Sequence, residues 1–223
     1  MQKKEIQINI NDFPDELHYI FYNAKVYDSS SHPSMKVLYS DSGYYLKIAE
    51  KNKLTKEAEM TQVFEQNNMG VELVSYITAQ NDYMVTKPAI GKDTTHYLDN
   101  PYKLCEVLAE AMKYLHNKPI KNIPVSPCMD LYEEKGHHLK YDTFIHGDFC
   151  LPNIILNNWK FSSFIDVGLS GIGDKHIDIY WVLWSLKFNL KTDKYNQYFL
   201  KLYGKENYDE NILKIVTEVE ENI

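Results

Sequence analysis

Short runs rich in β-branched and aromatic residues dominate the first part of the chain. Two of them, Met35–Ser40 and Tyr44–Ile48, are separated by Asp41-Ser42-Gly43, a hairpin-type turn in which Gly provides a permissive backbone. Tyr83–Thr86 has the pattern of another strand, and it ends at Lys87-Pro88 because proline cannot continue a sheet ladder. We therefore predict antiparallel strands in the N-terminal part.

Apolar residues at helical spacing predict the helices. Between the strands, Thr55–Gln66 carries Met60, Val63 and Phe64 at this spacing, with Thr55 as its N-cap. Further predicted helices are Pro101–Asn117, Trp181–Phe188 and Tyr195–Tyr203. Three apolar runs around turns are predicted as short strands, namely Thr143–Ile145, Asn153–Leu156 and Phe164–Val167. The change from strands to helices falls near residue 90, where Pro88 and Gly91 indicate a hinge.

Composition narrows the class of protein. The chain has 223 residues, of which 44% are hydrophobic, as expected for a folded globular protein. We expect no secretory signal, because Asn and Gln interrupt the apolar residues of MQKKEIQINI, and no membrane span, because no apolar run reaches about 18–20 residues. The three cysteines are odd in number and far apart, so we expect no disulfide framework and a reducing, cytoplasmic location. The net charge of −7 argues against a nucleic-acid partner.

One segment combines the residues that phosphoryl transfer requires. His146-Gly-Asp-Phe-Cys-Leu-Pro-Asn153 is followed by Phe164-Ile-Asp-Val-Gly168. A kinase catalytic loop has the order Asp-x-x-x-x-Asn, and a metal-binding Asp then precedes a residue pair that ends in Gly. Each short motif alone occurs by chance, but their combination between apolar strands is specific. We predict Asp148 as the catalytic carboxylate, and Asn153 and Asp166 as ligands of Mg²⁺.

The segment from Phe144 to Ser185 resembles the aminoglycoside phosphotransferase family, most closely its 3′-phosphotransferase branch. The resemblance rests on HGDFCLPNIIL, FIDVGLSG and DKHIDIYWVLWSL. It implies an α+β, two-lobed protein-kinase-like fold with a small antiparallel-sheet N-lobe and a mainly helical C-lobe. The expected division is residues 1–86 for the nucleotide-binding lobe, 87–92 for the hinge and 93–223 for the catalytic and acceptor-binding lobe.

The resemblance also implies a binding site for ATP or GTP. Lys47 occupies the place of the strand lysine that binds the donor phosphates, and helical phase favours Glu57 over Glu59 as its partner. The expected phosphate loop is Ser29–Ser34, with Ser31 and Ser34 as donors, and the adenine is expected at Val85, Thr86 and Pro88.

Other polar and aromatic residues receive supporting roles. We expect His146 to orient the loop of Asp148 through backbone hydrogen bonds, and the resemblance implies that Asp178 stiffens the same loop. His137, His138 and His176 lack the spacing of a metal site. Trp181, Trp184 and Phe188 have helical spacing and are predicted to pack in the core.

The sequence departs from the family pattern in its acceptor region. Leu169 stands where the 3′-phosphotransferase branch has an arginine, and the stretch Asn117–Ile145 lacks most of the longer helical insertion of the family. The remaining carboxylates that are candidates to face a polyamine are Asp130, Glu133, Glu134, Glu218, Glu220 and Glu221.

Three hypotheses follow from this pattern. The first is a magnesium-dependent kinase that phosphorylates a hydroxyl of an aminoglycoside and so confers antibiotic resistance. The second is a kinase of another small metabolite or antibiotic, which Leu169 and the short acceptor region would favour. The third is a nucleotide-binding family member without catalysis, against which the intact catalytic residues argue.

Overall fold

A computed structural model describes residues 4–30 and 35–222 of the protein. The chain divides into two compact units, of which the first contains Met1–Glu65 and Val71–Pro88 and the second contains Gln66–Gly70 and Ala89–Ile223. The segment Gln66–Gly70 belongs to the second unit although the expected division assigns it to the N-lobe. The reason is that Met69 is buried and its carbonyl oxygen accepts a hydrogen bond of 2.7 Å from Phe164 N.

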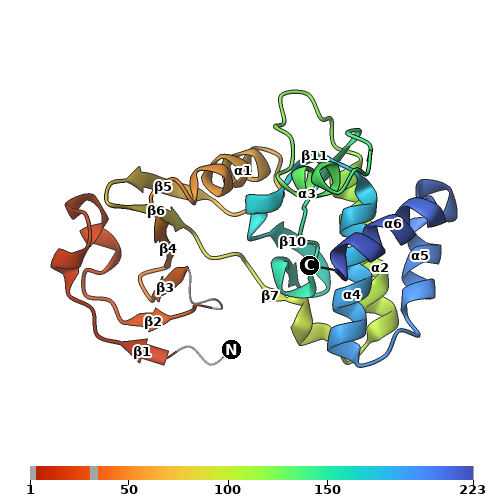
Figure 1. Ribbon diagram of the computed structural model, residues 1–223. Helices are drawn as coiled ribbons and strands as arrows, with labels where there is room; N and C mark the ends of the chain where they lie inside the picture. The colour runs from red at the N-terminus through yellow and green to blue at the C-terminus, as the bar shows by residue number, and fades with distance from the viewer. Residues whose placement is uncertain (1–3, 31–34, 223) are drawn as a thin grey trace. The chain divides into compact units, whose positions relative to one another are not determined.

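The first unit is built on an antiparallel sheet with the strand order β1-β2-β3-β4-β6-β5 (Figure 1). Its strands are β1 (Lys4–Ile6), β2 (Val26–Asp28), β3 (Lys36–Ser40), β4 (Tyr44–Glu50), β5 (Leu73–Thr78) and β6 (Asn81–Thr86). Its helical elements are the 3₁₀ helices η1 (Ile10–Asp12) and η2 (Asp15–Ile20) and the helix α1 (Thr55–Gln66), whose last residue falls in the second unit.

The β3–β4 hairpin and α1 confirm the predictions from local pattern. Leu38 pairs with Leu46 across the hairpin, and Gly43 has a φ of +89° in the connecting turn, a conformation that favours glycine. The helix α1 has the predicted bounds, although Thr55 is its first residue rather than its N-cap. The strands β1, β2 and β5 were not predicted.

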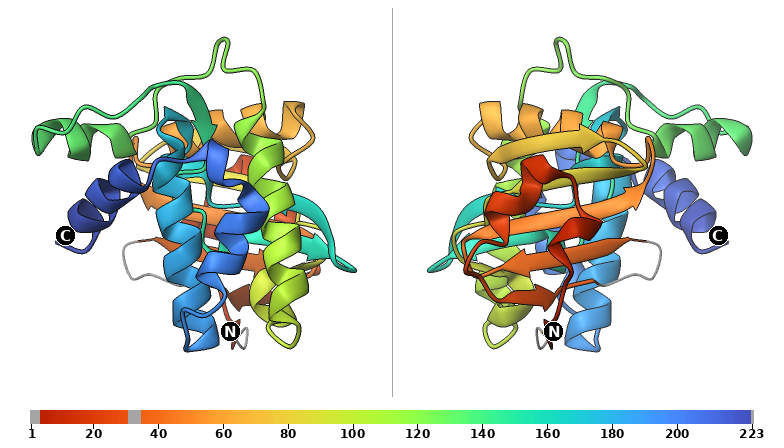
Figure 2. Two further views of the ribbon diagram at one scale, coloured as in Figure 1. Left: turned by 90° about the vertical axis from the view of Figure 1, so that its right-hand side faces the viewer. Right: turned by 90° about the vertical axis from the view of Figure 1, so that its left-hand side faces the viewer.

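The two faces of this sheet have different partners. Leu46 and Val85 pack on one face against Leu17 and Ile20 of η2, which crosses in front of the sheet in the right view of Figure 2. Met84, the residue before Val85 in β6, packs on the other face against α1. Because successive strand residues alternate between faces, Lys47, which pairs with Met84, belongs to the face that α1 covers.

The second unit is mainly helical. Its helices are α2 (Pro101–His116), α3 (Cys128–Glu134), α4 (Lys175–Leu190), α5 (Asn196–Tyr203) and α6 (Glu210–Glu220). Its 3₁₀ helices are η3 (Thr94–Tyr97), η4 (Leu151–Asn153), η5 (Val167–Leu169) and η6 (Lys205–Asn207). Its strands form two small sheets, one with β10 (Lys160–Phe164), β9 (Ile154–Asn157) and β7 (Lys92–Asp93), the other with β11 (Gly171–Gly173) and β8 (Thr143–Ile145).

Helix packing in this unit follows the apolar stripes of the helices. The helix α5 packs against α2, and α6 packs against α4, as the left view of Figure 2 shows. Leu108, Met112 and Leu115 of α2 have no exposed surface. Burial of such side chains contributes about 1.5–3 kcal/mol each before the entropy of ordering them is subtracted. The helices α2, α4 and α5 confirm the predicted helical segments, whereas α3 and α6 were not predicted.

Two predictions in this unit are wrong. The predicted strand Phe164–Val167 does not form, because β10 ends at Phe164 and Asp166 has the left-handed conformation with φ 57° and ψ 47°. The predicted core positions of Trp184 and Phe188 are also wrong, since these side chains are 42% and 55% exposed. Their rings stack on each other on the outer surface of α4, with centroids 5.1 Å apart.

Among the residues that the structure describes, we find no helix that is both long and apolar enough to cross a membrane.

Candidate active site

His146, Gly147 and Asp148 directly follow the strand β8, which places them in the candidate site. Gly147 has a φ of +83°, and a Cβ atom there would lie 2.3 Å from the carbonyl oxygen of Leu169. The position therefore requires glycine for two reasons, the left-handed backbone and the close approach of the second loop. Asp148 is partly exposed, whereas its neighbours Gly147 and Phe149 are buried.

Asn153 holds the carboxylate of Asp148. Its Nδ2 atom donates to Asp148 Oδ2 at 2.8 Å and to the backbone oxygen of Asp148 at 3.1 Å. The chain brings these two residues together by the 3₁₀ helix η4, which ends at Asn153. Because the nitrogen of the amide is committed to Asp148, Asn153 Oδ1 is the atom that can coordinate a metal ion.

His146 acts on the backbone, as its predicted structural role requires. Its Nδ1 accepts from Asp148 N at 3.3 Å, and its Nε2 lies 3.1 Å from the carbonyl oxygen of Ile165. Since a carbonyl oxygen only accepts, Nε2 carries the hydrogen and Nδ1 does not. The ring is buried, and this arrangement uses both of its nitrogens in holding the backbone.

Ile165 joins the two halves of the predicted metal site. Its N–H donates to the carbonyl oxygen of Asn153 at 3.0 Å, while its own carbonyl oxygen accepts from His146. Asp166 follows directly, with an exposed side chain on a left-handed backbone. The same pair of backbone bonds therefore fixes the start of the Asp166 turn to the loop that carries Asp148 and Asn153.

Asp178 binds the start of the catalytic loop from the first turn of α4. Its carboxylate accepts from His146 N and Gly147 N, each at 2.8 Å. Asp178 has no exposed surface, so water does not compete with the backbone for its carboxylate oxygens. A third partner, His116, was missed by the sequence reasoning, although it lies one helical turn beyond Met112 on the apolar stripe of α2.

The first unit contains the predicted pair of Lys47 and Glu57. Lys47 Nζ contacts Glu57 Oε1, and the side chains are largely buried, so Glu57 and not Glu59 is the partner in this contact. The pairing is confirmed, and its role in holding donor phosphates stays a prediction. A contact of this kind between two largely buried side chains fixes the position of the lysine on the sheet.

The predicted nucleotide contacts around the phosphates and the adenine have different outcomes. Ser31 and Ser34 lie outside the described residues. Val85 has no exposed surface, and its backbone lies in the ladder between Leu46 and Ser75, which gives it the place of a core residue. Thr86 ends β6, and Pro88 has no N–H to donate. The adenine contacts expected at Val85, Thr86 and Pro88 stay a prediction.

The predicted acceptor carboxylates have unequal surroundings. Glu133, Glu134 and Glu218 are exposed, and Glu218 pairs with Lys214 at 3.9 Å within α6. Glu220 is half-buried and accepts a hydrogen bond of 2.5 Å from Tyr132 Oη. Burial raises the pKa of Glu220, the bond from Tyr132 opposes this, and the charge of Asp148 raises it further.

Two cysteines lie beside the same loop. Cys128 donates to the carbonyl oxygen of Gly147 at 3.5 Å, and Cys150 donates to that of Trp181 at 3.9 Å. Burial raises the pKa of Cys128 to about 12, and it also raises the pKa of Cys150, with a further increase from Asp148. Both thiols stay protonated at neutral pH, so neither has the reactivity of a thiolate nucleophile.

The candidate metal ligands fit magnesium rather than a softer ion. Asn153 and Asp166 offer amide and carboxylate oxygens, which are the ligands that Mg²⁺ prefers, and it completes its shell with water and phosphate oxygens. No cluster of three or more His, Cys, Asp or Glu side chains that could hold a metal is found within residues 4–30 and 35–222.

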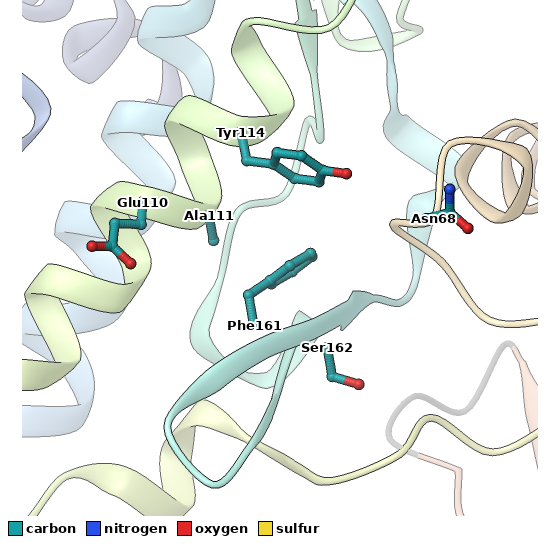
Figure 3. A pocket seen from close by; sticks show the side chains of 6 residues that line it. All are labelled: Asn68, Glu110, Ala111, Tyr114, Phe161 and Ser162. Atoms are coloured by element: carbon teal, nitrogen blue, oxygen red, sulfur yellow. The ribbon is translucent and has the colours of Figure 1, made fainter.

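A pocket of the second unit lies apart from the predicted residues (Figure 3). Its lining residues are Asn68, Glu110, Ala111, Tyr114, Phe161 and Ser162. They come from the turn after α1, from α2 and from β10, and they include no candidate catalytic or metal-binding residue. We assign this pocket no part in phosphoryl transfer.

Comparisons with known proteins decide the family. A sequence profile of the Phosphotransferase enzyme family matches residues 130–211, which include the whole candidate loop. A probable aminoglycoside 3′-phosphotransferase from Lactococcus lactis is 39% identical over 251 aligned positions, covering 96% of this chain and 96% of the relative. The chain belongs to the aminoglycoside phosphotransferase family. It is a phosphotransferase, and the family resemblance expected from the motifs is confirmed.

More distant relatives in the aminoglycoside phosphotransferase family agree with this assignment. An aminoglycoside 3′-phosphotransferase from Niallia circulans is 27% identical over 175 positions, which cover 63% of this chain and 67% of that protein. The structure of an aminoglycoside-3′-phosphotransferase of type VIII has a TM-score of 0.68 at 16% identity and covers 100% of this chain and 94% of its own. The predicted α+β, protein-kinase-like fold is thereby confirmed.

A further solved structure of similar fold was determined with ligands bound. The structure of APH(3'')-Id from Streptomyces rimosus in complex with ADP and streptomycin has a TM-score of 0.66 at 18% identity, and the match covers 83% of this chain and 89% of that one. The ligands in its title belong to that protein, and the similarity establishes the fold of this one.

Proposed function

We propose that the protein transfers the γ-phosphoryl group of ATP or GTP to a hydroxyl group of an aminoglycoside. The observation that carries this proposal is the joint geometry of Asp148 and Asn153, in which one amide fixes the catalytic carboxylate and presents its oxygen for a metal. The 39% identity to a probable aminoglycoside 3′-phosphotransferase supports the choice of acceptor. The location that we propose is the cytoplasm, where ATP is available and the free cysteines stay reduced.

In this proposal Asp148 serves the acceptor. Its carboxylate accepts a hydrogen bond from the acceptor hydroxyl and orients the oxygen toward the γ-phosphorus. It receives the proton as the new O–P bond forms, while the bond from the γ-phosphorus to the bridging oxygen breaks and ADP or GDP leaves. The hydrogen bonds from Asn153 keep the carboxylate in one orientation while the hydroxyl approaches. Positioning of this kind supplies a large part of the rate in phosphoryl transfer.

Lys47, Asn153 and Asp166 serve the donor in the proposal. Lys47, held by Glu57, neutralises charge on the donor phosphates. Asn153 and Asp166 would hold Mg²⁺, which when bound neutralises negative charge on the phosphate oxygens. The hydrogen bond between Ile165 N and the carbonyl oxygen of Asn153 keeps these two ligands in a fixed relation.

Glu220 is the acceptor carboxylate that the geometry favours over the other candidates. It is half-buried and accepts a hydrogen bond from Tyr132, and the charge of Asp148 contributes to raising its pKa. A carboxylate in these surroundings attracts an ammonium group, and a bound ammonium in turn favours its charged form. Glu133, Glu134 and Glu218 are more exposed, so screening by salt reduces what they contribute.

One observation favours a different acceptor as the second candidate. Leu169 is 44% exposed at the position where the 3′-phosphotransferase branch has arginine. The alignment with the Lactococcus lactis relative spans 251 positions, more than the 223 residues of this chain, so part of that relative has no counterpart here. An apolar side chain beside the loop and a shorter chain fit a less charged small-molecule alcohol.

An acceptor panel tests the proposal and separates the two candidates. The purified protein is incubated with Mg²⁺, γ-labelled ATP or GTP, and a set of acceptors that includes aminoglycosides with and without a 3′-hydroxyl, amino alcohols and neutral sugars. We expect saturable transfer to aminoglycosides that carry the 3′-hydroxyl, and a product with phosphate at that position by ³¹P NMR. Transfer only to uncharged alcohols would reject the aminoglycoside assignment in favour of the second candidate.

The role of Glu220 has its own matched comparison. The variant Glu220→Gln keeps the size and the hydrogen bond with Tyr132 but removes the charge, whereas Glu218→Gln removes an exposed charge on the same helix. We expect Glu220→Gln to raise the KM of a cationic acceptor by about 10-fold, as the loss of a charge-assisted contact predicts. Glu218→Gln should leave that KM within about 2-fold. Equal effects of the two variants would reject the assignment of Glu220.

A further inference from the structure

A continuous series of side-chain hydrogen bonds connects three helices of the second unit to the loop of Asp148. Tyr203 Oη at the end of α5 lies 2.8 Å from His116 Nδ1, in the last turn of α2. His116 Nε2 lies 3.0 Å from Asp178 Oδ2 on α4. Asp178 in turn accepts the N–H groups of His146 and Gly147, the two residues directly before Asp148.

The hydrogens in this series have one consistent arrangement. A carboxylate only accepts hydrogen bonds, so His116 Nε2 must carry the hydrogen that it shares with Asp178. In the neutral ring, which carries one hydrogen, His116 Nδ1 accepts the hydrogen of Tyr203 Oη. Burial and the charge of Asp178 raise the pKa of Tyr203, so its hydroxyl keeps this hydrogen at neutral pH. Every group in the series thus donates or accepts as its chemistry allows.

Because the site is buried, water cannot readily replace His116 as the hydrogen-bond donor to Asp178. Asp178 is 0% exposed and the side chain of His116 is 5% exposed, so water has little access to the carboxylate. The Asp178 oxygen nearest His116, Oδ2, also accepts the N–H of His146. If His116 no longer donates, Asp178 can recover a third donor only by turning, and turning weakens its bonds to His146 and Gly147.

We propose that His116 is a positioning residue for phosphoryl transfer, which acts by fixing the Asp178 carboxylate and through it the backbone that carries Asp148. This inference rests on the proposed function of Asp148. Neither His116 nor Tyr203 touches the reacting groups in this assignment. The atom that matters is His116 Nε2, because it alone contacts Asp178.

The site leaves little tolerance for displacement of this backbone. Gly147 already packs against the carbonyl oxygen of Leu169 in a left-handed conformation, and Asp148 is the next residue. The carboxylate of Asp148 is also bound to Asn153, so a shift of the loop moves both groups together. Displacement by about 1 Å at a reacting group can lower a rate by about 100-fold.

Amide substitutions at His116 separate the two ring nitrogens. The variant His116→Gln places an N–H donor near the position of Nε2, His116→Asn places one near Nδ1, and His116→Leu removes both. We expect His116→Gln to retain kcat within about 3-fold, and His116→Asn and His116→Leu to lower kcat by about 10- to 100-fold. The KM values for nucleotide and acceptor should stay within about 2-fold in all three variants, because no substrate contact is lost.

A second readout works without any acceptor. Hydrogen exchange of the backbone amides of His146 and Gly147 reports directly on their bonds to Asp178. We expect exchange at these two amides to be faster by at least about 10-fold in His116→Asn and His116→Leu than in His116→Gln. The variant Tyr203→Phe keeps the ring and the donor of His116, so both kcat and exchange should change by less than about 3-fold.

The outcomes distinguish this inference from the proposed function. If the wild-type protein transfers no phosphate to any acceptor, the proposed function fails, while the exchange experiment still tests the contact between His116 and Asp178. The inference is overturned if His116→Gln and His116→Asn lose kcat equally, or if kcat follows melting temperature instead of the position of the donor. It is also overturned if the His146 and Gly147 amides exchange at the wild-type rate in folded His116→Asn. Where His116→Leu does not fold, the Gln and Asn pair decides.

Discussion

The side-chain amide nitrogen of Asn153 donates two hydrogen bonds to Asp148, one to the carboxylate oxygen Oδ2 at 2.8 Å and one to the backbone oxygen at 3.1 Å. One residue therefore fixes both the side chain and the backbone of the predicted catalytic residue. The same contact turns the amide oxygen of Asn153 away from Asp148. This relation links the acceptor side of the proposed reaction to the metal side.

The substitution Asn153→Ala should affect both sides at once. We expect kcat to fall by about 10- to 100-fold and the Mg²⁺ concentration for half-maximal rate to rise, because the carboxylate loses its partner and the metal loses an oxygen. Steady-state rates across a magnesium titration measure both effects. Asn157→Ala, an exposed residue at the end of β9, is the matched control and should match the wild type. A lower rate with no change in the Mg²⁺ requirement would contradict the assignment of Asn153 as a ligand.

A substitution that tests Asp166 has to tolerate the left-handed backbone conformation of this residue. Asn adopts the left-handed conformation readily, whereas Ala in that conformation adds about 1 kcal/mol of strain. We expect Asp166→Asn and Asp166→Ala to lose turnover alike, with the Ala variant less stable by about that amount. Thermal unfolding and a turnover assay on both variants check this. Turnover close to wild type in Asp166→Asn would show that the charge of Asp166 is not required.

Gly147 and Gly136 form a matched pair for testing the close approach of the two loops. Both have positive φ, but a Cβ at Gly147 would lie 2.3 Å from Leu169 O, and one at Gly136 would meet nothing within 4 Å. Gly136→Ala should cost only the backbone strain, about 1 kcal/mol, while Gly147→Ala should cost at least about 2 kcal/mol more. Urea unfolding measures the difference. Equal losses in the two variants would contradict the tight packing at Gly147.

Much of the fold could be predicted where the signal is local. The β3–β4 hairpin needs only two apolar runs and a Gly turn, and α1 and α2 follow from helical spacing within each segment. The helix α6 was not predicted, although Ile212, Val216 and Val219 have the same spacing. The signal for α6 was therefore present in the sequence.

The backbone at the site was harder to predict because it depends on contacts between distant residues. The run Phe164–Val167 is apolar enough for a strand, yet the turn at Asp166 is set by bonds of Ile165 to Asn153 and His146. Nothing in the sequence pairs His116 with Asp178, which lies 62 residues further along the chain. By contrast, the pair Lys47 and Glu57 was predictable, since helical phase places Glu57 on the inward face.

Asp82 should make the first unit sensitive to acid. Burial alone would raise its pKa, but hydrogen bonds from Leu54 N and Asn52 N, together with those from Tyr76 and Thr78, outweigh burial and hold the pKa below its ordinary value of 3.8. A carboxylate with a lowered folded-state pKa contributes stability above the unfolded-state value and loses it as pH falls through the folded-state value.

The variant Asp82→Asn tests this pH dependence. We expect it to be less stable than the wild type by about 1–3 kcal/mol at pH 7, because buried donors lose a charged acceptor. The difference should shrink as the pH falls below about 3.8, the ordinary value for this carboxyl. Urea unfolding between pH 3 and pH 7 measures it. A difference that is constant or grows toward low pH would contradict the lowered pKa of Asp82.

The most direct test of the central claim is a single-turnover measurement on Asp148→Asn with ATP, Mg²⁺ and an aminoglycoside that the wild type accepts. Asn keeps the size of the side chain but cannot receive the proton of the hydroxyl, so we expect transfer to fall by at least about 1,000-fold while nucleotide affinity stays within about 3-fold. The control Asp142→Asn changes an exposed carboxylate just before β8 and should transfer at the wild-type rate. Transfer by Asp148→Asn at a rate near that of the wild type would contradict the assignment of Asp148 as the catalytic carboxylate.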